Sequence, residues 1–258
     1  DVSIIDEMPA GRKPVKTYWR YSEKREQIYK FVKDQVQQGQ QAYIVFPLVE
    51  ESEKLDLEAA TESYDRMTKG IFADEKIALL HGRMKSEEKD QIMNAFKAGE
   101  TQILVSTTVI EVGVDVANAT VMVIEHAERF GLPQLHQLRG RVGRGKHQSY
   151  CILIAQQPFS ADALQRLKTM TATNDGFRIA EVDLQIRGPG EFFGTKQHGM
   201  PELRIANPVQ DTNILIKARK EAFQLVHDDP QLLNDENAVI HAHFKESYRD
   251  KLNLLRAG

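Results

Sequence analysis

Short apolar runs alternate with longer, more polar segments through the first 157 residues of the chain. Apolar runs of this length are typical of buried strands, which the pattern predicts at 15–19, 42–49, 76–81, 102–107, 120–125 and 149–155. Strands that are apolar on both faces are typical of parallel sheets with helices on both sides. The pattern therefore predicts an α/β fold, in which ligands bind outside the carboxyl ends of the strands. The segments that follow 102–107 and 120–125 become candidate site segments on this ground.

The segments between these runs carry the spacing of amphipathic helices. They predict helices at 22–38, 57–72, 86–98 and 134–144, the last with Pro133 near its start. Beyond Gln157 helices are predicted at 159–171, 177–187, 211–226 and 239–255, although the apolar spacing of 177–187 also partly fits a strand. Residues 187–201 hold several glycines and prolines and are predicted to form an irregular loop. A mostly helical extension thus follows the α/β part.

Composition narrows the class of protein. With 258 residues, 41% hydrophobic, 28% charged and a net charge of −3, the chain is predicted to be globular, without a general attraction for nucleic acid. No apolar run is long enough for a membrane helix. Cys151, the one cysteine, has no partner for an internal disulfide, which favours a reducing, cytoplasmic compartment. The absence of an initiator Met favours a piece of a longer protein.

The stretch QLRGRVGRG at 137–145 concentrates charge in a region without acidic residues from Arg129 to Ala161. On a helix, at about 100° per residue, Gln137, Arg141 and Arg144 fall within an arc of roughly 60°. Arg139 points nearly opposite, where it serves the structure or meets solvent. The apolar members, predicted to face the sheet, are Leu135, Leu138 and Val142.

Two guanidinium groups on one line need anionic partners, and their planar donors match phosphate oxygens. The glycines at 140 and 143 would let a ligand or another backbone approach closely. Spacing alone gives equal weight to an anion site and to its alternative. In that alternative, the helix is basic and exposed to solvent, or its arginines pair with acids from elsewhere in the chain.

Several motifs in order along the chain resemble those of superfamily 2 helicases. QLRGRVGR at 137–144 resembles motif VI, STTVIEVGVDV at 106–116 resembles motif V, and AYIVFPLVEES at 42–52 resembles motif IV. IALLHGRM at 77–84 resembles the strand and turn between motifs IV and V. The resemblance implies the second RecA-like lobe of a helicase motor, with a parallel sheet flanked by helices.

A further stretch, DLQIRGPGEFFGTKQHG at 183–199, resembles the translocation motif of the RecG and Mfd helicases, and its sequence is more similar to that of RecG. The resemblance implies three regions. Residues 1–20 would link to a first motor lobe that this chain lacks, residues 21–157 would form the second lobe, and residues 158–258 a helical extension with the translocation hairpin and loop.

The family resemblance also implies roles for residues. Arg141 and Arg144 would act as arginine fingers on the transferred phosphoryl group of ATP, and Gln137 would position them. The ATP-binding residues would be Gly113, Asp115 and Gly140, with Asp115 a candidate ribose contact. From the sequence alone, Asp115 is equally a helix or turn cap.

Three more residues receive roles in DNA binding and translocation. Thr107 would contact the nucleic-acid backbone, although a strand-end hydroxyl more often satisfies local backbone. Arg187 and Gln197 would couple lobe movement to duplex DNA. Without the resemblance, Arg187 is a charge at a helix C-terminus and Gln197 an ordinary loop residue.

The chain contains no Gly-x-x-x-x-Gly-Lys-[Ser/Thr] phosphate loop and no Asp-Glu-x-His motif. Mg²⁺ would be held mainly by the absent first lobe, and no metal site is predicted here, since His241 and His243 do not share a helix face. We therefore expect an ATP-dependent translocase of branched duplex DNA, forks or Holliday junctions, inactive as this fragment. Its partners would be that lobe and a wedge domain. The alternatives are an Mfd-type transcription-repair translocase and a non-catalytic nucleic-acid-binding domain.

Overall fold

The fold was analysed in a computed structural model, which describes residues 13–47, 53–107, 116–192 and 212–245. Its strands are β1 (Lys16–Tyr21), β2 (Gln41–Val45), β3 (Ile77–Leu80), β4 (Ile103–Ser106), β5 (Ala119–Ile124) and β6 (Tyr150–Ala155). They form one parallel sheet in the order β1-β6-β5-β2-β4-β3. The predicted α/β fold and its parallel sheet are confirmed.

Helices connect β1 to β2, β2 to β3, β3 to β4 and β5 to β6, as is usual for parallel strands. They are α1 (Arg25–Gln37), α2 (Glu53–Lys69), α3 (Ser86–Lys97) and α4 (Leu132–Arg139), with short 3₁₀ turns η1 (Ser22–Lys24) and η4 (Ala127–Arg129). After β6 come α5 (Ala161–Ala172) and α6 (Gly176–Phe192). All the elements predicted up to residue 187 are present, with boundaries shifted by a few residues.

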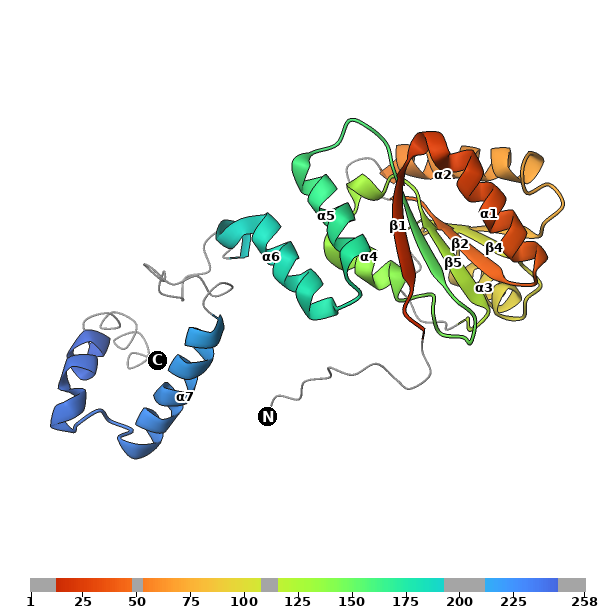
Figure 1. Cartoon of the computed structure of the whole chain (residues 1–258). Coiled ribbons are helices and arrows are strands. Elements are labelled where there is room, and N and C mark those ends of the chain that lie inside the picture. The colour runs from red at the N-terminus through yellow and green to blue at the C-terminus, as the bar shows by residue number, and fades with distance from the viewer. Residues whose placement is uncertain (1–12, 48–52, 108–115, 193–211, 246–258) are drawn as a thin grey trace. The chain divides into compact units, whose positions relative to one another are not determined.

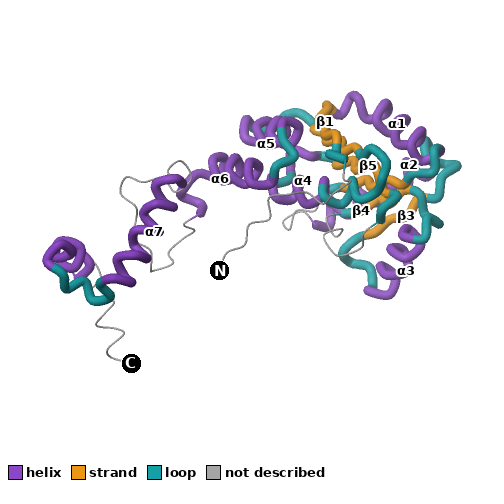
Figure 2. Tube along the Cα trace, turned by 60° about the horizontal axis from the view of Figure 1, so that its bottom comes forward, coloured by secondary structure: helices purple, strands orange, loops and turns teal. Residues whose placement is uncertain are grey.

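The sheet separates two hydrophobic layers because alternate strand residues face opposite sides. In β2, Ala42 and Ile44 pack with α1 and α2, whereas Tyr43 and Val45 pack on the face covered by α3, α4 and α5. Figures 1 and 2 show this sandwich of helices around the sheet. All five residues of β2 are buried, which explains why its sequence lacks a polar face.

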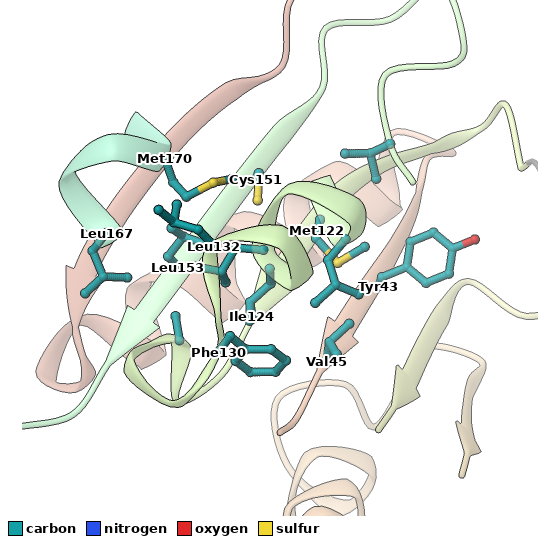
Figure 3. Packing of buried hydrophobic residues seen from close by; sticks show 14 of the residues in the cluster. Tyr43, Val45, Met122, Ile124, Phe130, Leu132, Cys151, Leu153, Leu167 and Met170 are labelled. Atoms are coloured by element: carbon teal, nitrogen blue, oxygen red, sulfur yellow. The ribbon is translucent and has the colours of Figure 1, made fainter. Parts of the chain in front are cut away.

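The helices α4, α5 and α6 share one core with the sheet. Leu132 of α4 and Leu167 and Met170 of α5 pack around Leu153 and Cys151 of β6 (Figure 3). Ile179 and Val182 of α6 join the same cluster. The chain accordingly divides into compact units at Asp1–Gly188 and Pro189–Gly258. The division into a linker, a lobe and an extension at residues 20 and 157 stays a prediction, and residues 16–20 lie in β1.

One expectation for this region is wrong. Residues 187–192, predicted as the start of an irregular loop, continue α6 to Phe192. Proline removes one helical hydrogen bond and its ring crowds the carbonyl oxygen four residues earlier, at a cost of about 3 kcal/mol, so Pro189 disfavours this last turn of α6 without excluding it. Residues 193–201 lie outside the described residues.

The second unit contains α7 (Thr212–Asp228), the 3₁₀ turn η5 (Asp235–Asn237) and a helix over 238–245. The carboxylate of Asp229 shapes the turn after α7, because it accepts hydrogen bonds from the backbone N–H groups of Leu233 and Asn234 and from Asn237 Nδ2. The helices predicted at 211–226 and 239–255 are confirmed as far as the structure describes them. No helix in the described ranges has both the length and the apolar character needed to cross a membrane.

Candidate functional site

The arginine-rich stretch forms a turn at the end of α4. The helix ends at Arg139, Gly140 caps it, and Gly143 adopts a φ of +82°, which no helix contains. The prediction that residues 134–144 form one continuous helix is therefore wrong. Its cause is local, because successive glycines favour leaving the helix and only glycine takes this φ without strain.

The turn holds Arg144 close to the end of α4. Arg144 Nε donates to the carbonyl oxygen of Gly140 at 3.2 Å, so the chain folds back on the helix end. A Cβ on Gly140 would lie 3.2 Å from the carbonyl oxygen of Gln137. Gln137 and Gly140 are exposed, and Arg141 and Arg144 are partly exposed. The three predicted side chains are thus each accessible to solvent at the end of α4, and their convergence stays a prediction. We call residues 137–145 the arginine turn.

Gly143 and Gly145 allow the arginine turn to pack closely against the chain just before β1 and β5. A Cβ on Gly143 would lie 2.7 Å from Val15 Cγ2, just before β1. A Cβ on Gly145 would collide with the carbonyl oxygen of Ala117, which precedes β5. The turn thus lies at the amino edge of the sheet, because α4 runs antiparallel to the strands. Parallel sheets commonly bind ligands outside the carboxyl ends of their strands, but the arginine turn lies at the opposite edge.

Arg139 has a structural role, which is one of the two roles predicted for it from the sequence. Its side chain is 3% exposed and donates through Nη1 to the carbonyl oxygens of Met170 (3.0 Å) and Thr173 (2.8 Å). Its Nη2 meets His136 Nδ1 at 3.1 Å. These acceptors lie at the end of α5 and on α4 itself, so Arg139 joins the two helices.

Thr107 lies at the carboxyl edge, directly after β4. Its backbone N–H donates to Leu80 O, while its Oγ1 is buried and has no hydrogen-bond partner among the described residues. An unsatisfied buried hydroxyl costs free energy, so a polar ligand at this point would be favourable. Thr107 and the arginine turn sit at opposite ends of the strands. The segment 108–115 joins Thr107 to Val116 near the start of β5 and lies outside the described residues.

An ion-pair network at the carboxyl edge was missed by sequence reasoning. Arg25 contacts both carboxylate oxygens of Glu125, with Nη2 to Oε2 at 2.9 Å, and Tyr29 donates to Glu125 Oε1 at 2.6 Å. Burial, with the adjacent Glu125 carboxylate, raises the pKa of Tyr29 well above its usual value. The signal was a charged residue that ends the apolar run of β5. The network fixes the start of α1 to the end of β5.

Next to this network lies a cleft of about 370 Å³. Its floor is apolar and its rim carries Arg66, His126 and the half-exposed Arg25. His126 has a left-handed φ of 49°, an uncommon conformation for a residue other than glycine. The second arginine–carboxylate pair at this edge, Arg129 with Asp56 at 2.8 Å, ties η4 to α2.

Several predicted site residues are not placed by these contacts. Gly113, Asp115 and Gln197 lie outside the described residues, and Arg187 lies on α6 without a described side chain. Within the described ranges, no three His, Cys, Asp or Glu side chains gather as a metal site.

The sequence Gly-Arg-Val-Gly-Arg-Gly-Lys at 140–146 matches the first seven positions of a phosphate loop. His147 then stands where the motif needs Ser or Thr. The segment also leads into β6, whereas a phosphate loop follows a strand and opens a helix. The arginine turn is thus not a phosphate loop.

Comparison with known proteins agrees with this architecture. Residues 23–146 match the family model of the helicase conserved C-terminal domain, and residues 173–255 match that of the ATP-dependent DNA helicase RecG, domain 3, C-terminal. The chain is 56% identical over 232 residues to the ATP-dependent DNA helicase RecG of Synechocystis, covering 90% of this chain and 28% of the relative. It is 52% identical over 240 residues to that of Bacillus subtilis, covering 93% and 35%.

The chain thus spans about a third of the length of the curated relatives it matches. A solved structure of RecG bound to a three-way DNA junction aligns with a TM-score of 0.63 and 47% identity, covering 81% of this chain and 26% of that one. The motifs, the sheet order and both family models agree: the chain belongs to the RecG family of helicases.

Proposed function

We propose that this chain is the second motor lobe of an ATP-dependent translocase of branched duplex DNA, and that the arginine turn completes an ATP site whose other half belongs to a first lobe. The observation that carries the proposal is the arginine turn itself. Gly143 and Gly145 hold it against the amino edge of the sheet, with Arg141 and Arg144 both reachable from solvent.

The residues present fit the γ-phosphate of ATP. Guanidinium groups stay charged at any working pH and match phosphate oxygens in geometry. Arg144 Nε is hydrogen-bonded to the carbonyl oxygen of Gly140, which limits the orientations of the Arg144 side chain. ATP with Mg²⁺ supplies the phosphoryl group that is transferred. Gly113 and Asp115 would bind the nucleotide beside Gly140, and the Mg²⁺ would be held mainly by the first lobe.

In this proposal, Arg141 and Arg144 stabilise the negative charge that develops on the phosphoryl oxygens, while Gln137 positions them. A finger of this kind contributes roughly 10³–10⁵-fold in rate, which is about 4–7 kcal/mol of barrier. The chain supplies no phosphate loop to hold the β- and γ-phosphates. By itself it is therefore expected to be inactive.

The DNA side of the motor is assigned to the other end of the strands. The place of Thr107 at the carboxyl edge, directly after β4, supports a contact to a DNA phosphate there, which requires its buried Oγ1 to become exposed. The proposal gives Arg187 and Gln197 a role in translocation. The homologous RecG bound to a three-way DNA junction supports branched DNA as the partner. The proposed setting is replication-fork regression, recombination and DNA repair.

The test is Arg141→Ala and Arg144→Ala, made separately in the complete protein. Each should lower DNA-stimulated ATP hydrolysis by about 10³-fold or more while the affinity for a three-way junction stays unchanged. Arg178→Ala is the matched control, because Arg178 is an exposed arginine on α6 whose guanidinium meets Glu181. Normal turnover with lost DNA affinity would instead favour a non-catalytic DNA-binding domain. Binding to RNA polymerase in place of junction unwinding would favour an Mfd-type translocase.

A further inference from the structure

The strand β1 forms one edge of the sheet, because it pairs with β6 alone among the described strands (Figure 1). The N–H of Lys16 donates to Ser149 O just before β6, and the direction of the backbone groups alternates along a strand. The N–H and C=O groups of Thr17, Trp19 and Tyr21 therefore point outward from the sheet. Outward backbone groups of this kind can pair with a further strand.

One face of β1 is also uncovered. Its residues Lys16, Tyr18 and Arg20 are exposed, whereas every residue of the inner strand β2 is buried. Tyr18 lies in register with Ile152 of β6, and so belongs to the face of the sheet that packs with α1. The helix α1 thus covers β6 on this face and leaves β1 open.

A groove of about 380 Å³ lies between α1 and β1, and we call it the edge groove. Its apolar lining comes from Tyr18, Tyr150 and Ile152 of the sheet and from Ile28 and Phe31 of α1. The rings of Phe31 and Tyr150 meet edge to face with their centroids 5.2 Å apart. The volume lies within the range of pockets that hold small ligands or side chains, about 300–1,000 Å³.

The polar lining of the edge groove is basic. Arg20 and Lys24 line it together with Gln27, and the described lining residues include no acid. The guanidinium carbon of Arg20 lies 5.6 Å from the centroid of the Tyr18 ring, and its Nη1 donates to Trp19 O at 2.8 Å. Arg20 therefore covers part of the open edge, as charged side chains commonly do on edge strands. A carboxylate is a stronger partner for this guanidinium than a backbone carbonyl.

The other face of β1 carries a second aromatic group. The ring centroids of Trp19 and Tyr21 are 5.0 Å apart, and Tyr21 stacks on Phe159 with the centroids 6.2 Å apart. The side chain of Tyr21 is exposed. A strand paired with β1 would find apolar contacts on both of its faces, since its side chains alternate between them.

We propose that β1 is a docking edge for an extended acidic segment of a partner protein, which pairs with β1 as a further strand. The main chain of that segment takes up the outward backbone groups, an aromatic side chain fills the edge groove, and flanking carboxylates meet Arg20 and Lys24. A nucleic-acid strand fits this edge less well, because phosphate oxygens only accept hydrogen bonds and would meet the outward carbonyl oxygens. The proposal uses neither the arginine turn nor Thr107, so it does not rest on the proposed function.

The experiment measures the fluorescence anisotropy of labelled peptides with the complete protein. The probe is Gly-Asp-Val-Phe-Val-Asp-Gly, whose Asp and Phe side chains share one face of a strand. Tyr18→Ala and Arg20→Glu should each raise its Kd by about tenfold or more, as expected for the loss of an aromatic anchor or the reversal of a charge. A probe with Lys in place of Asp should not bind.

Two further probes test the strand pairing itself. One carries N-methyl groups on both Val residues, and the other carries them on Phe and both Asp residues. Only one of these sets points its N–H groups at β1 in a paired strand. One probe should therefore bind as before, and the other about tenfold more weakly.

Lys97→Glu and Phe177→Ala are the matched controls, an exposed lysine on α3 and an exposed phenylalanine on α6, and neither should change the Kd. Should Tyr18→Ala fail to fold, Arg20→Glu and the methylated probes decide. Absence of peptide binding, or equal Kd values for the two methylated probes, would overturn the proposal. So would binding of an oligothymidylate at this edge in place of the peptide, or a dimer in sedimentation that Arg20→Glu dissociates, since a second copy would then occupy the edge.

Discussion

The backbone of Gly145 lies directly against the carbonyl oxygen of Ala117. Gly145 directly follows the segment that resembles helicase motif VI, and Ala117 directly follows the segment that resembles motif V. Their contact fixes the arginine turn to the start of β5, at a point where no side chain fits. Among the described glycines, this is the tightest approach to another backbone.

Gly145→Ala is expected to move the arginine turn off the start of β5. The added methyl group meets backbone, which cannot rotate away, so overpacking should cost about 1–3 kcal/mol of unfolding free energy. Hydrolysis in the complete protein should fall as well. Gly131→Ala is the control, because its Cβ would meet only ordinary contacts at 3.7 Å. Equal urea denaturation midpoints for the two variants would contradict the packing described here.

Glu125→Gln should destabilise the lobe by about 2 kcal/mol. Removing one partner of a buried ion pair costs about 3–5 kcal/mol, and the Arg25 side chain, 38% exposed, recovers part of this from solvent. Tyr29 can still donate to the amide oxygen. Urea denaturation of the chain measures the change. Arg25→Met should cost more, about 3–5 kcal/mol, because it leaves the Glu125 carboxylate, 1% exposed, without its ion-pair partner.

The control for this network is Glu26→Gln. Glu26 pairs with Lys30 one helical turn away, and both side chains are largely exposed. Exposed pairs of this kind contribute little, so no measurable change is expected. A loss equal to that of Glu125→Gln would show that the buried network has no special weight.

His136 is expected to titrate below the ordinary histidine value of 6.5. Burial lowers its pKa, and the nearby positive charge of Arg139 lowers it further. Below pH 6.5 the unfolded chain then binds a proton that the folded chain resists. Stability should therefore fall as the pH drops from about 7 through 6.5 towards the folded pKa, and hold above that range. NMR titration of the imidazole gives the folded pKa directly, and a value above 6.5 would be inconsistent with the contact to Arg139.

Cys151 should be unreactive in the folded protein. Burial raises the pKa of its thiol to about 12, and only the thiolate attacks thiol reagents. Ellman's reagent at pH 8 should detect no thiol until the chain is denatured, and then one per chain. Fast labelling under native conditions would mean that the core between β6 and α5 opens readily.

Periodicity was sufficient for most of the fold because each strand is apolar along its whole length and each helix has one apolar face. Ala42 and Tyr43 face opposite sides, yet both are buried, and this two-sided burial is what a continuous apolar run predicts. The order of the strands was not predicted, because periodicity does not report which strands pair. The end of α4 was misjudged because contacts with Val15 and Ala117, more than 25 residues away, decide the path of the turn.

For the candidate site, too, some features were predictable from the sequence and others were not. The convergence of Gln137, Arg141 and Arg144 stays a prediction, and the continuous helix from which it was argued ends at Arg139. The capping of α5 by Arg139 was not predictable in detail, since its acceptors are backbone carbonyls and carry no sequence signal. The Arg25–Glu125 pair joins residues 100 positions apart, which periodicity does not detect.

The most direct measurement is DNA-stimulated ATP hydrolysis by residues 1–258, alone and in place of the matching region of the Bacillus subtilis relative. The chain alone should show no stimulated hydrolysis, because it holds only one half of the proposed site. The chimaera should hydrolyse ATP, and Arg144→Ala in the chimaera should abolish this activity. Hydrolysis by the isolated chain, or an Arg144→Ala chimaera as active as its parent, would contradict the account.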